Sequence, residues 1–457
     1  MTAEPIVASV PIVSVCGSLF RYGVRDEALV PANHRGGNPS SRYEGGQGLD
    51  VGLAPSDNCP MTGDHELSTG TVTLARAKEI VGSGHLWIYA GFVHAVAGQP
   101  VAGDLVDVLM PNGRFYARGF YNPMSKIRIR ILAFLDERIG PAFWHERIAQ
   151  AVRLRKRIVS SATAYRVIYG EADRLPGLIV DRYGDVLVMQ TLSSGMDRRK
   201  EMLADLLCKA TGLSKVYLRN DAKSRLLEGL RPVTGFLCGN GATTIEIQEG
   251  PARFLVDVAH GQKTGWYCDQ RENRLAAARL ASGQAILEVF CHTGAFGIQA
   301  ALAGAGSVEG LDVSEEALVV ARDHARLNGV QDRCSYRSAD AFDEMRRLVQ
   351  ARKQYDVVIL DPPAFARSKQ AVPRALAGYK DINLLGFRLT RPEGIIVTSS
   401  CSHHVSEMDL WKVLTQAAQD ANRPVRLLEQ RGQASDHPVL LTMPETRYLK
   451  CFILQVL

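Results

Sequence analysis

The feature that most constrains the fold of this chain is the regular alternation of short apolar segments with helix-forming segments over residues 261–457. The Ala-rich stretch Gly294–Ala303, for example, follows an apolar run and is typical of a helix. Strands that alternate with helices at this spacing form a parallel sheet with helices on both faces. We therefore predict an α/β fold here, with ligands bound beyond the carboxyl ends of the strands. The predicted strands include Ile286–Phe290, Val308–Asp312, Asp356–Asp361 and Gly394–Ser399.

The sequence before residue 261 divides into three further regions. Residues 1–70 are rich in glycine and show no sustained periodicity, so we predict a disordered extension and assign it no function. Residues 71–150 are predicted to form a small β-rich domain, because Gly103–Met110 and Arg114–Tyr121 are typical of two strands joined by an Asn-Gly turn. Residues 151–260 are predicted to form a small α+β domain.

Two basic segments in these regions allow more than one interpretation. In residues 125–132, isoleucines alternate with Lys126, Arg128 and Arg130, a row that either binds phosphates or forms an ordinary solvated face. The basic stretch at residues 140–159 is predicted to be a solvated linker helix. Neither segment by itself establishes a partner.

Composition narrows the class of protein. The chain of 457 residues contains no apolar run of the ~18–20 residues that a membrane helix needs. Its N-terminus lacks the pattern of a secretory signal, so the cytoplasm is the predicted location. The 9 cysteines are scattered and form no CxxC pair, so we predict neither a metal site nor a disulfide framework. A formal net charge of +6 permits a nucleic-acid partner without establishing one.

The loop after the first predicted strand indicates a nucleoside cofactor that has no pyrophosphate. It holds a single tight turn, Thr293-Gly294, in place of the three glycines of a dinucleotide site. Asp312 at the next strand end can accept both hydroxyls of a ribose, and Asp340 at the third can accept an adenine amino group. Either acid could instead cap a helix. We predict S-adenosylmethionine as the cofactor, with Phe290, Thr293, Gly294, Asp312 and Asp340 among its contacts.

Two further strand ends carry the predicted reacting groups. One strand ends in Asp361-Pro362-Pro363-Ala364-Phe365, where the prolines stiffen the turn and the aromatic ring can stack on a flat heterocycle. Pro362, Pro363 and Phe365 are therefore the predicted substrate contacts. The next strand ends near Cys401, whose thiolate is a strong soft nucleophile although a lone cysteine is more often a small core residue.

These groups suit methylation of carbon 5 of a pyrimidine. Addition of the Cys401 thiolate to carbon 6 turns carbon 5 into a nucleophile, and Asp361 can hold the ring nitrogen that gains electron density. A base must then remove the carbon-5 proton. His403, His404 and water are all candidates for that base.

Five motifs follow one another along the chain: Gly84–Gly91, Gly170–Tyr183, Gly261–Gly265, Asp361–Phe365 and Ser400–His404. On these motifs, residues 71–457 resemble the PUA-domain family of large-subunit (23S-type) ribosomal RNA cytosine-5 methyltransferases. The resemblance implies a class I fold: a Rossmann-like seven-stranded methyltransferase domain over residues 261–457, after a PUA domain and a central α+β domain. It further implies that Lys263, Thr264 and Arg271 hold the methionine end of the cofactor and that Cys401 is the nucleophile.

The chain departs from related enzymes at two places. Many RNA cytosine-5 methyltransferases carry a second cysteine after the proline of this motif, where this chain has Pro363-Ala364, so the group that assists product release is open. Cys291-His292 replaces the usual Ser-Tyr, which we expect to be tolerated because backbone dominates that loop.

Other functions remain open at this stage. One is an RNA guanine or adenine N-methyltransferase that needs no covalent intermediate. Another is a non-catalytic RNA-binding assembly factor, against which the acids at the strand ends argue. A nicotinamide dehydrogenase is disfavoured, since its glycine fingerprint is missing. The predicted partner is ribosomal RNA, folded or in an assembled subunit; the sequence leaves a homodimer open.

Overall fold

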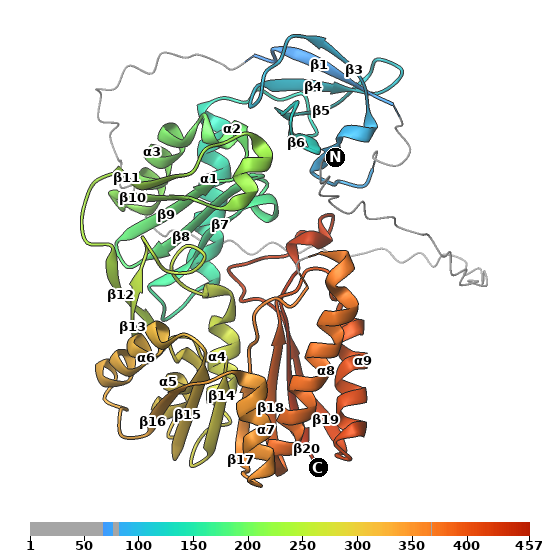
Figure 1. The fold of residues 1–457 in the computed structure, drawn as a ribbon. Coiled ribbons are helices and arrows are strands. Elements are labelled where there is room, and N and C mark those ends of the chain that lie inside the picture. Colours follow the sequence, from blue (N-terminus) through green and yellow to red (C-terminus); the bar gives the residue numbers. More distant parts are fainter. Residues whose placement is uncertain (1–66, 76–81, 367) are drawn as a thin grey trace, which may run out of the picture. The chain divides into compact units, whose positions relative to one another are not determined.

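The computed structural model describes residues 67–75, 82–366 and 368–457. Most of the predicted extension at residues 1–70 therefore lies outside the described residues. The described part of the chain holds four β-sheets, of six, five, two and seven strands (Figure 1). Among its helices, none is both long and apolar enough to cross a membrane.

The first domain is built on the six-stranded sheet, in the order β2-β6-β5-β4-β1-β3. The predicted hairpin is present as β4 paired with β5, and β6 continues the sheet. Val72, Val106, Ile129 and Ile131 form its core. The strands are β1 (Gly70–Leu74), β2 (Trp87–Tyr89), β3 (Val93–Gly98), β4 (Leu105–Leu109), β5 (Phe115–Tyr121) and β6 (Ile127–Ala133).

The basic row on β6 is not a uniform phosphate-binding or solvated face. Lys126 is exposed, but the Arg130 guanidinium lies mostly buried between Glu171 and Glu228, at 3.3 and 3.1 Å. Arg128 donates to the backbone carbonyls of Asn122 and Pro123. Arg130 thus joins the first domain to the second, because both of its acidic partners lie far along the chain.

Helix α1 (Pro141–Ile158) follows and spans the predicted boundary at residue 150. Proline at its first position fits a helix start, since that N–H has no intrahelical partner. The prediction of a solvated helix is wrong for Arg155, which is 1% exposed and forms two hydrogen bonds with Asp173, at 2.5 and 2.8 Å. Sequence spacing could not reveal this pair, because Asp173 comes from a later turn.

The central domain holds the five-stranded sheet β11-β10-β9-β8-β7 and the separate hairpin β12-β13. Helices α1 and α3 pack on its sheet through Ile148, Leu203 and Leu207. Its elements are β7 (Ala164–Tyr169), β8 (Leu178–Tyr183), β9 (Val186–Thr191), α2 (Ser194–Asp197), α3 (Lys200–Thr211), β10 (Lys215–Asn220), β11 (Val233–Cys238), β12 (Thr244–Glu249) and β13 (Ala252–Asp257).

The C-terminal domain is the predicted α/β unit. Its seven strands run in the order β16-β15-β14-β17-β18-β20-β19, and β20 alone is antiparallel to both of its neighbours. The elements are α4 (Arg271–Ala278), β14 (Ala285–Val289), α5 (Ala295–Leu302), β15 (Ser307–Asp312), α6 (Glu315–Leu327), β16 (Cys334–Ser338), α7 (Ala341–Gln350), β17 (Tyr355–Leu360), α8 (Val372–Leu389), β18 (Thr390–Ser400), α9 (Glu407–Asp420), β19 (Val425–Arg431) and β20 (Lys450–Val456).

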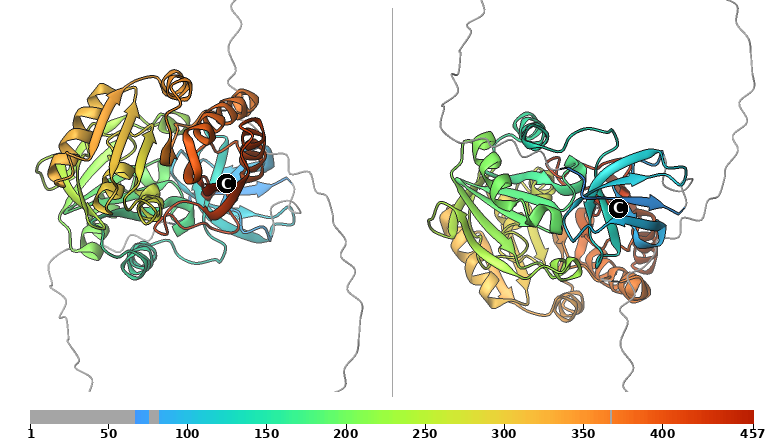
Figure 2. Two further views of the ribbon diagram at one scale, coloured as in Figure 1. Left: turned by 90° about the horizontal axis from the view of Figure 1, so that it is seen from below. Right: turned by 90° about the horizontal axis from the view of Figure 1, so that it is seen from above.

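The alternating side chains of this sheet build two cores. Ile286, Val357 and Ile359 face α4, α5 and α6, while Leu287 and Val358 face α7, α8 and α9. Helices α8 and α9 lie side by side on their face (Figures 1 and 2). Since both faces are covered, the central strands β14 and β17 are largely apolar and buried, and the polar residues that line the cavity lie mostly at the strand ends.

Candidate active site

A cavity of about 450 Å³ opens at the carboxyl ends of β14, β15, β17 and β18. The cavity lies beyond the carboxyl ends of the strands, where the sequence predicts that a ligand binds. Its volume is within the range of small-molecule sites. Its wall includes eight of the predicted site residues: Lys263, Phe290, Thr293, Asp312, Asp361, Pro362, Pro363 and Cys401.

The loop from β14 to α5 borders the cavity. Phe290, His292 and Gly294 all have positive φ, at 63°, 49° and 75°. Gly294 is required there, because a Cβ would lie 2.6 Å from the Tyr336 hydroxyl. Glu288 fixes the start of α5 by accepting hydrogen bonds from two backbone N–H groups of that helix. Burial raises the pKa of Glu288 to about 8.

Asp312 ends β15 with its carboxylate turned to this loop. One oxygen accepts from the His292 N–H at 2.8 Å and the other from the Ser314 N–H at 3.0 Å. Ser314, rather than Asp312, caps helix α6. Each Asp312 oxygen keeps a lone pair, so the carboxylate can still accept from a pair of hydroxyls such as those of a ribose.

The segment before α4 supplies charged groups to the same cavity. The Lys263 ammonium lies 2.6 Å from Asp269 Oδ2 and 4.5 Å from the centre of the Tyr267 ring. Burial opposes ionisation of Asp269, but Lys263 and Tyr448 hold its pKa below the ordinary range. Asp269 Oδ1 is buried and has no hydrogen-bond partner among the described residues.

These groups fit S-adenosylmethionine. An unpaired carboxylate oxygen on the wall suits the ammonium of the methionine end, since buried carboxylates require donors. Asp312, which lines the cavity and keeps spare lone pairs, suits the ribose.

Asp361 and Cys401 lie together on the wall of this cavity. Gln270 donates to Asp361 Oδ1 at 2.8 Å. Burial, with a contribution from the charge of Asp269, raises the pKa of Asp361 to about 6. Burial and the charge of Asp361 raise the pKa of Cys401 to about 11. The sulfur is therefore a neutral thiol at neutral pH, and it must lose its proton before it can act as a nucleophile.

The residues after Asp361 divide between the cavity and the core. Pro362 and Pro363 line the cavity, whereas Phe365 packs on Tyr379 with ring centres 4.7 Å apart. Phe290 approaches Phe365 edge-on at 6.5 Å. Phe365 thus lies behind the wall, where it supports the turn that carries the prolines.

Four predicted cofactor residues are not part of the cavity wall: Thr264, Arg271, Gly294 and Asp340. Thr264 donates to Asp181 at 2.6 Å. Arg271 binds both carboxylate oxygens of Asp436, at 3.0 and 3.1 Å. The Asp340 carboxylate caps α7 by accepting from two backbone N–H groups, as the alternative interpretation allowed.

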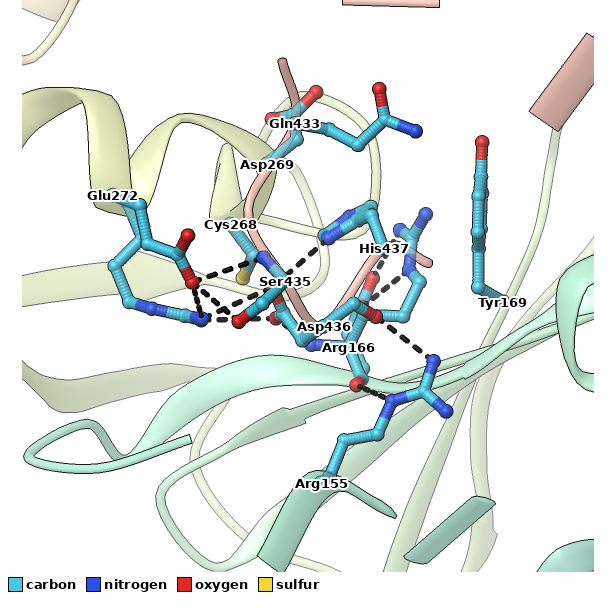
Figure 3. A network of polar contacts seen from close by, with 12 residues as sticks. Arg155, Arg166, Tyr169, Cys268, Asp269, Glu272, Gln433, Ser435, Asp436 and His437 are labelled. Atoms are coloured by element: carbon cyan, nitrogen blue, oxygen red, sulfur yellow. Dashed lines mark hydrogen bonds and ion pairs between the residues drawn. The ribbon is translucent and has the colours of Figure 1, made fainter. Parts of the chain in front are cut away.

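Asp436 is the centre of a buried polar network between the central and C-terminal domains (Figure 3). Its carboxylate also accepts from the Arg166 N–H at 2.7 Å, and its carbonyl accepts from Arg155 at 2.9 Å. His437 contacts the same carboxylate at 3.2 Å. The network fixes the segment between β19 and β20, which carries Tyr448 to the Lys263–Asp269 pair.

Sequence reasoning missed Asp269 and Gln270 on the cavity wall, and Lys450 near it. Asp269 and Gln270 stand in the polar stretch that follows the Gly261–Gly265 motif, so their position was available as a signal. Lys450 had no such signal in the sequence, because the pairing of β18 with β20 is what brings it near Cys401.

Comparison with known proteins agrees with this fold. Residues 225–399 match the S-adenosylmethionine-dependent methyltransferase family, and residues 74–134 match a PUA-like domain. A SAM-dependent methyltransferase structure from Streptococcus mutans superposes with a TM-score of 0.72 at 19% identity, covering 84% of this chain and 100% of its own. A second methyltransferase structure, solved with SAH, gives a TM-score of 0.73 at 19% identity and covers 85% and 100%. Fold and site together define an S-adenosylmethionine-dependent methyltransferase with a PUA-like domain.

Curated relatives narrow the class. The "Ribosomal RNA large subunit methyltransferase I" of Shewanella denitrificans is 43% identical over 379 residues, covering 81% of this chain and 95% of that protein. The protein of the same name from Shewanella frigidimarina is 42% identical, with the same coverage. The chain belongs to the ribosomal RNA large subunit methyltransferase I family.

Proposed function

We propose that this enzyme methylates carbon 5 of a cytosine in large-subunit ribosomal RNA through a covalent bond to Cys401. The observation that carries the proposal is the shared cavity of Cys401, Asp361 and Asp312. A nucleophile, an acid of raised pKa and an acceptor for a ribose then surround one space. The names of the curated relatives support the ribosomal substrate.

The first step is addition of sulfur to the ring. The Cys401 thiol loses its proton, and the thiolate forms a bond to carbon 6 of the cytosine. Electron density moves to ring nitrogen 3, where Asp361 donates a proton or a hydrogen bond. The pKa of about 6 suits Asp361 to this role, because a carboxyl that titrates near neutral pH can both hold and release a proton.

The second step forms the new carbon–carbon bond. S-adenosylmethionine, when bound, supplies an electrophilic methyl group on its sulfonium. Carbon 5, made nucleophilic by the addition, takes that methyl group. A base then removes the carbon-5 proton, the carbon 6–sulfur bond breaks, and Cys401 leaves with the bonding pair. His403, His404 and water remain the candidates for the base.

The RNA on either side of the target base needs its own contacts. A groove of about 550 Å³ shares Lys263 with the cavity, and its lining includes Arg166, Arg219, Lys223 and His403. His403 stacks on Tyr448 with ring centres 5.4 Å apart. Cations beside aromatic rings bind phosphates and unstacked bases, so this groove is our proposed path for the flanking nucleotides. A cytoplasmic location and a homodimer stay predictions.

One experiment tests the proposal against an N-methyltransferase. Ribosomal RNA from cells with and without the protein is compared by bisulfite sequencing, and the expected result is one cytosine that resists conversion only when the protein is present. Purified enzyme should also form a covalent complex with RNA containing 5-fluorocytosine, because fluorine at carbon 5 cannot be lost as a proton.

The Cys401→Ser variant supplies the matched control. It should bind S-adenosylmethionine like the wild type, form no covalent complex and have no measurable activity. Full activity of Cys401→Ser would overturn the covalent mechanism and favour methylation of a nitrogen. Normal cofactor binding without turnover on any ribosomal RNA would favour an assembly factor.

A further inference from the structure

Lys450 is a buried cation next to the candidate nucleophile. It begins β20 and pairs in register with Ser400, the residue before Cys401. Its side chain is 6% exposed. The ammonium donates to the carbonyl of Ser402 at 2.7 Å and to that of Tyr448 at 2.9 Å. Ser400 precedes Cys401 and Ser402 follows it. Lys450 therefore contacts the backbone on both sides of Cys401.

This ammonium has no counter-ion in the described part of the chain. Two carbonyls occupy two of its three N–H donors, and no described carboxylate forms an ion pair with it. Glu407 is the acid whose charge acts on it, but Glu407 bonds Gln430 and Arg447. Burial accordingly lowers the pKa of Lys450 to about 8. Burying a cation without a counter-ion costs folding free energy. An anion that forms beside Lys450 during the reaction, and is absent from the resting enzyme, would offset this cost.

Ionisation of Cys401 creates an anion between Ser400 and Ser402, the two residues that Lys450 contacts. The charges of Asp361 and Asp269 raise the pKa of Cys401, whereas those of Lys263 and Lys450 lower it. Lys263 is already paired with Asp269 at 2.6 Å, so much of its charge is compensated. Lys450 is the uncompensated cation of the two.

We propose that Lys450 is a positioning residue for Cys401, whose thiolate it stabilises when the S–H proton leaves to water or to Asp361 and again when the sulfur leaves the cytosine ring. The proposal rests on the proposed function for its role in turnover. Its effect on the sulfur itself does not depend on RNA, so it can be measured separately.

The test is the pH dependence of Cys401 alkylation by iodoacetamide in the full-length protein without RNA. Peptide mass spectrometry follows Cys401 separately from the other cysteines, and Cys401→Ser identifies its peptide. In Lys450→Met we expect the alkylation profile to shift up by about one pH unit, which makes the rate at pH 8 about tenfold lower. Lys450→Arg should stay within about threefold of the wild type, because it keeps the charge. In turnover, kcat should fall in Lys450→Met while KM for RNA is unchanged.

Lys412→Met on the exposed face of α9 is the matched control and should alkylate like the wild type. Lys450→Gln, which can still donate to a carbonyl, repeats the comparison if the methionine variant does not fold. A folded Lys450→Met or Lys450→Gln protein whose Cys401 profile overlays that of Lys412→Met would overturn the proposal. If Cys401→Ser instead retains full activity, the proposed function fails, while a shifted alkylation profile still supports the link between Lys450 and the sulfur.

Discussion

At the scale of single residues, Asp361 is the group whose ionisation bears most directly on the reaction. Because its pKa is about 6, both the ionised and the protonated form of Asp361 are populated near neutral pH. Asp361→Asn cannot pass a proton to the ring nitrogen, so we expect kcat to fall by about 100–10,000-fold. Binding of S-adenosylmethionine, measured by calorimetry, should change by less than about threefold.

The exposed Asp332→Asn is the control for Asp361→Asn and should retain full activity. It removes one carboxylate from the same domain without touching the cavity. If Asp361→Asn turned over at a rate comparable to this control, proton donation by Asp361 would be excluded.

Asp312 is the residue that should determine cofactor affinity. Its two oxygens each hold one backbone N–H and each have room for a hydroxyl. Hydrogen bonds to a charged group contribute about 1.5–3 kcal/mol each, so Asp312→Ala should weaken S-adenosylmethionine binding by at least about tenfold. Asp323→Ala on α6, whose carboxylate pairs with the exposed Arg326, should bind normally in the same calorimetric titration. Equal affinities for the two variants would remove Asp312 from the cofactor site.

Three of the residues that sequence placed correctly stand at or just after a strand end, although Asp340, which also follows a strand, caps α7 instead. Asp312, Asp361 and Cys401 reach the cavity because parallel strands end at one edge of the sheet. Arg271 bonds instead to Asp436, which lies 165 positions along the chain. Such partners are set by tertiary packing, and neither spacing nor residue type reveals them.

At the scale of elements, the segment between β19 and β20 depends on one buried carboxylate. Burial would raise the pKa of Asp436, but His437 and Arg271 hold it below its ordinary 3.8. Because folding lowers this pKa, the carboxylate stabilises the fold above about pH 4 and that contribution is lost as the pH falls further. Asp436→Asn removes the carboxylate that binds Arg271 through both oxygens and leaves it the longer contact to Glu272 at 3.4 Å, so we expect a loss of about 3 kcal/mol at neutral pH.

Thermal unfolding of Asp436→Asn between pH 3 and 7 checks this expectation. The variant should melt well below the wild type at pH 7, and the difference should narrow as the pH falls. Asp420→Asn, which removes an exposed partner of Lys380, should lose about 1 kcal/mol or less. A gap that stayed constant down to pH 3 would mean that the Asp436 charge contributes nothing.

The secondary structure of the C-terminal domain was predictable because its signals are local. The predicted strand Val308–Asp312 is observed as β15 (Ser307–Asp312), and the predicted helix Gly294–Ala303 as α5 (Ala295–Leu302). The position of β20 between β18 and β19 was not predictable from these signals. Strand order depends on which apolar faces pack together, and that information is spread over the whole domain.

At the scale of the whole molecule, the first domain and the central domain share a hydrophobic core. Phe120 and Leu132 from the β-rich sheet pack in one cluster with Trp144 of α1 and Met196 of α2. Phe120 stacks on Trp144 with ring centres 6.0 Å apart. The PUA-like domain is therefore part of the folded unit, and its removal would expose this cluster and the carboxylate of Glu228.

Two truncations test where the functional molecule begins. Residues 65–457 form one compact unit, and the curated relatives match 81% of the chain. A protein of residues 65–457 should therefore keep its melting temperature within about 2 °C and its kcat/KM within about twofold, since a surface change alters stability by about 0.5 kcal/mol or less. A protein of residues 135–457 lacks Phe120 and Arg130, the partners of Trp144 and Glu228, and should melt far lower or aggregate. A loss of more than about tenfold in kcat/KM for residues 65–457, with the melting temperature retained, would instead assign a role in RNA recognition to the first 64 residues.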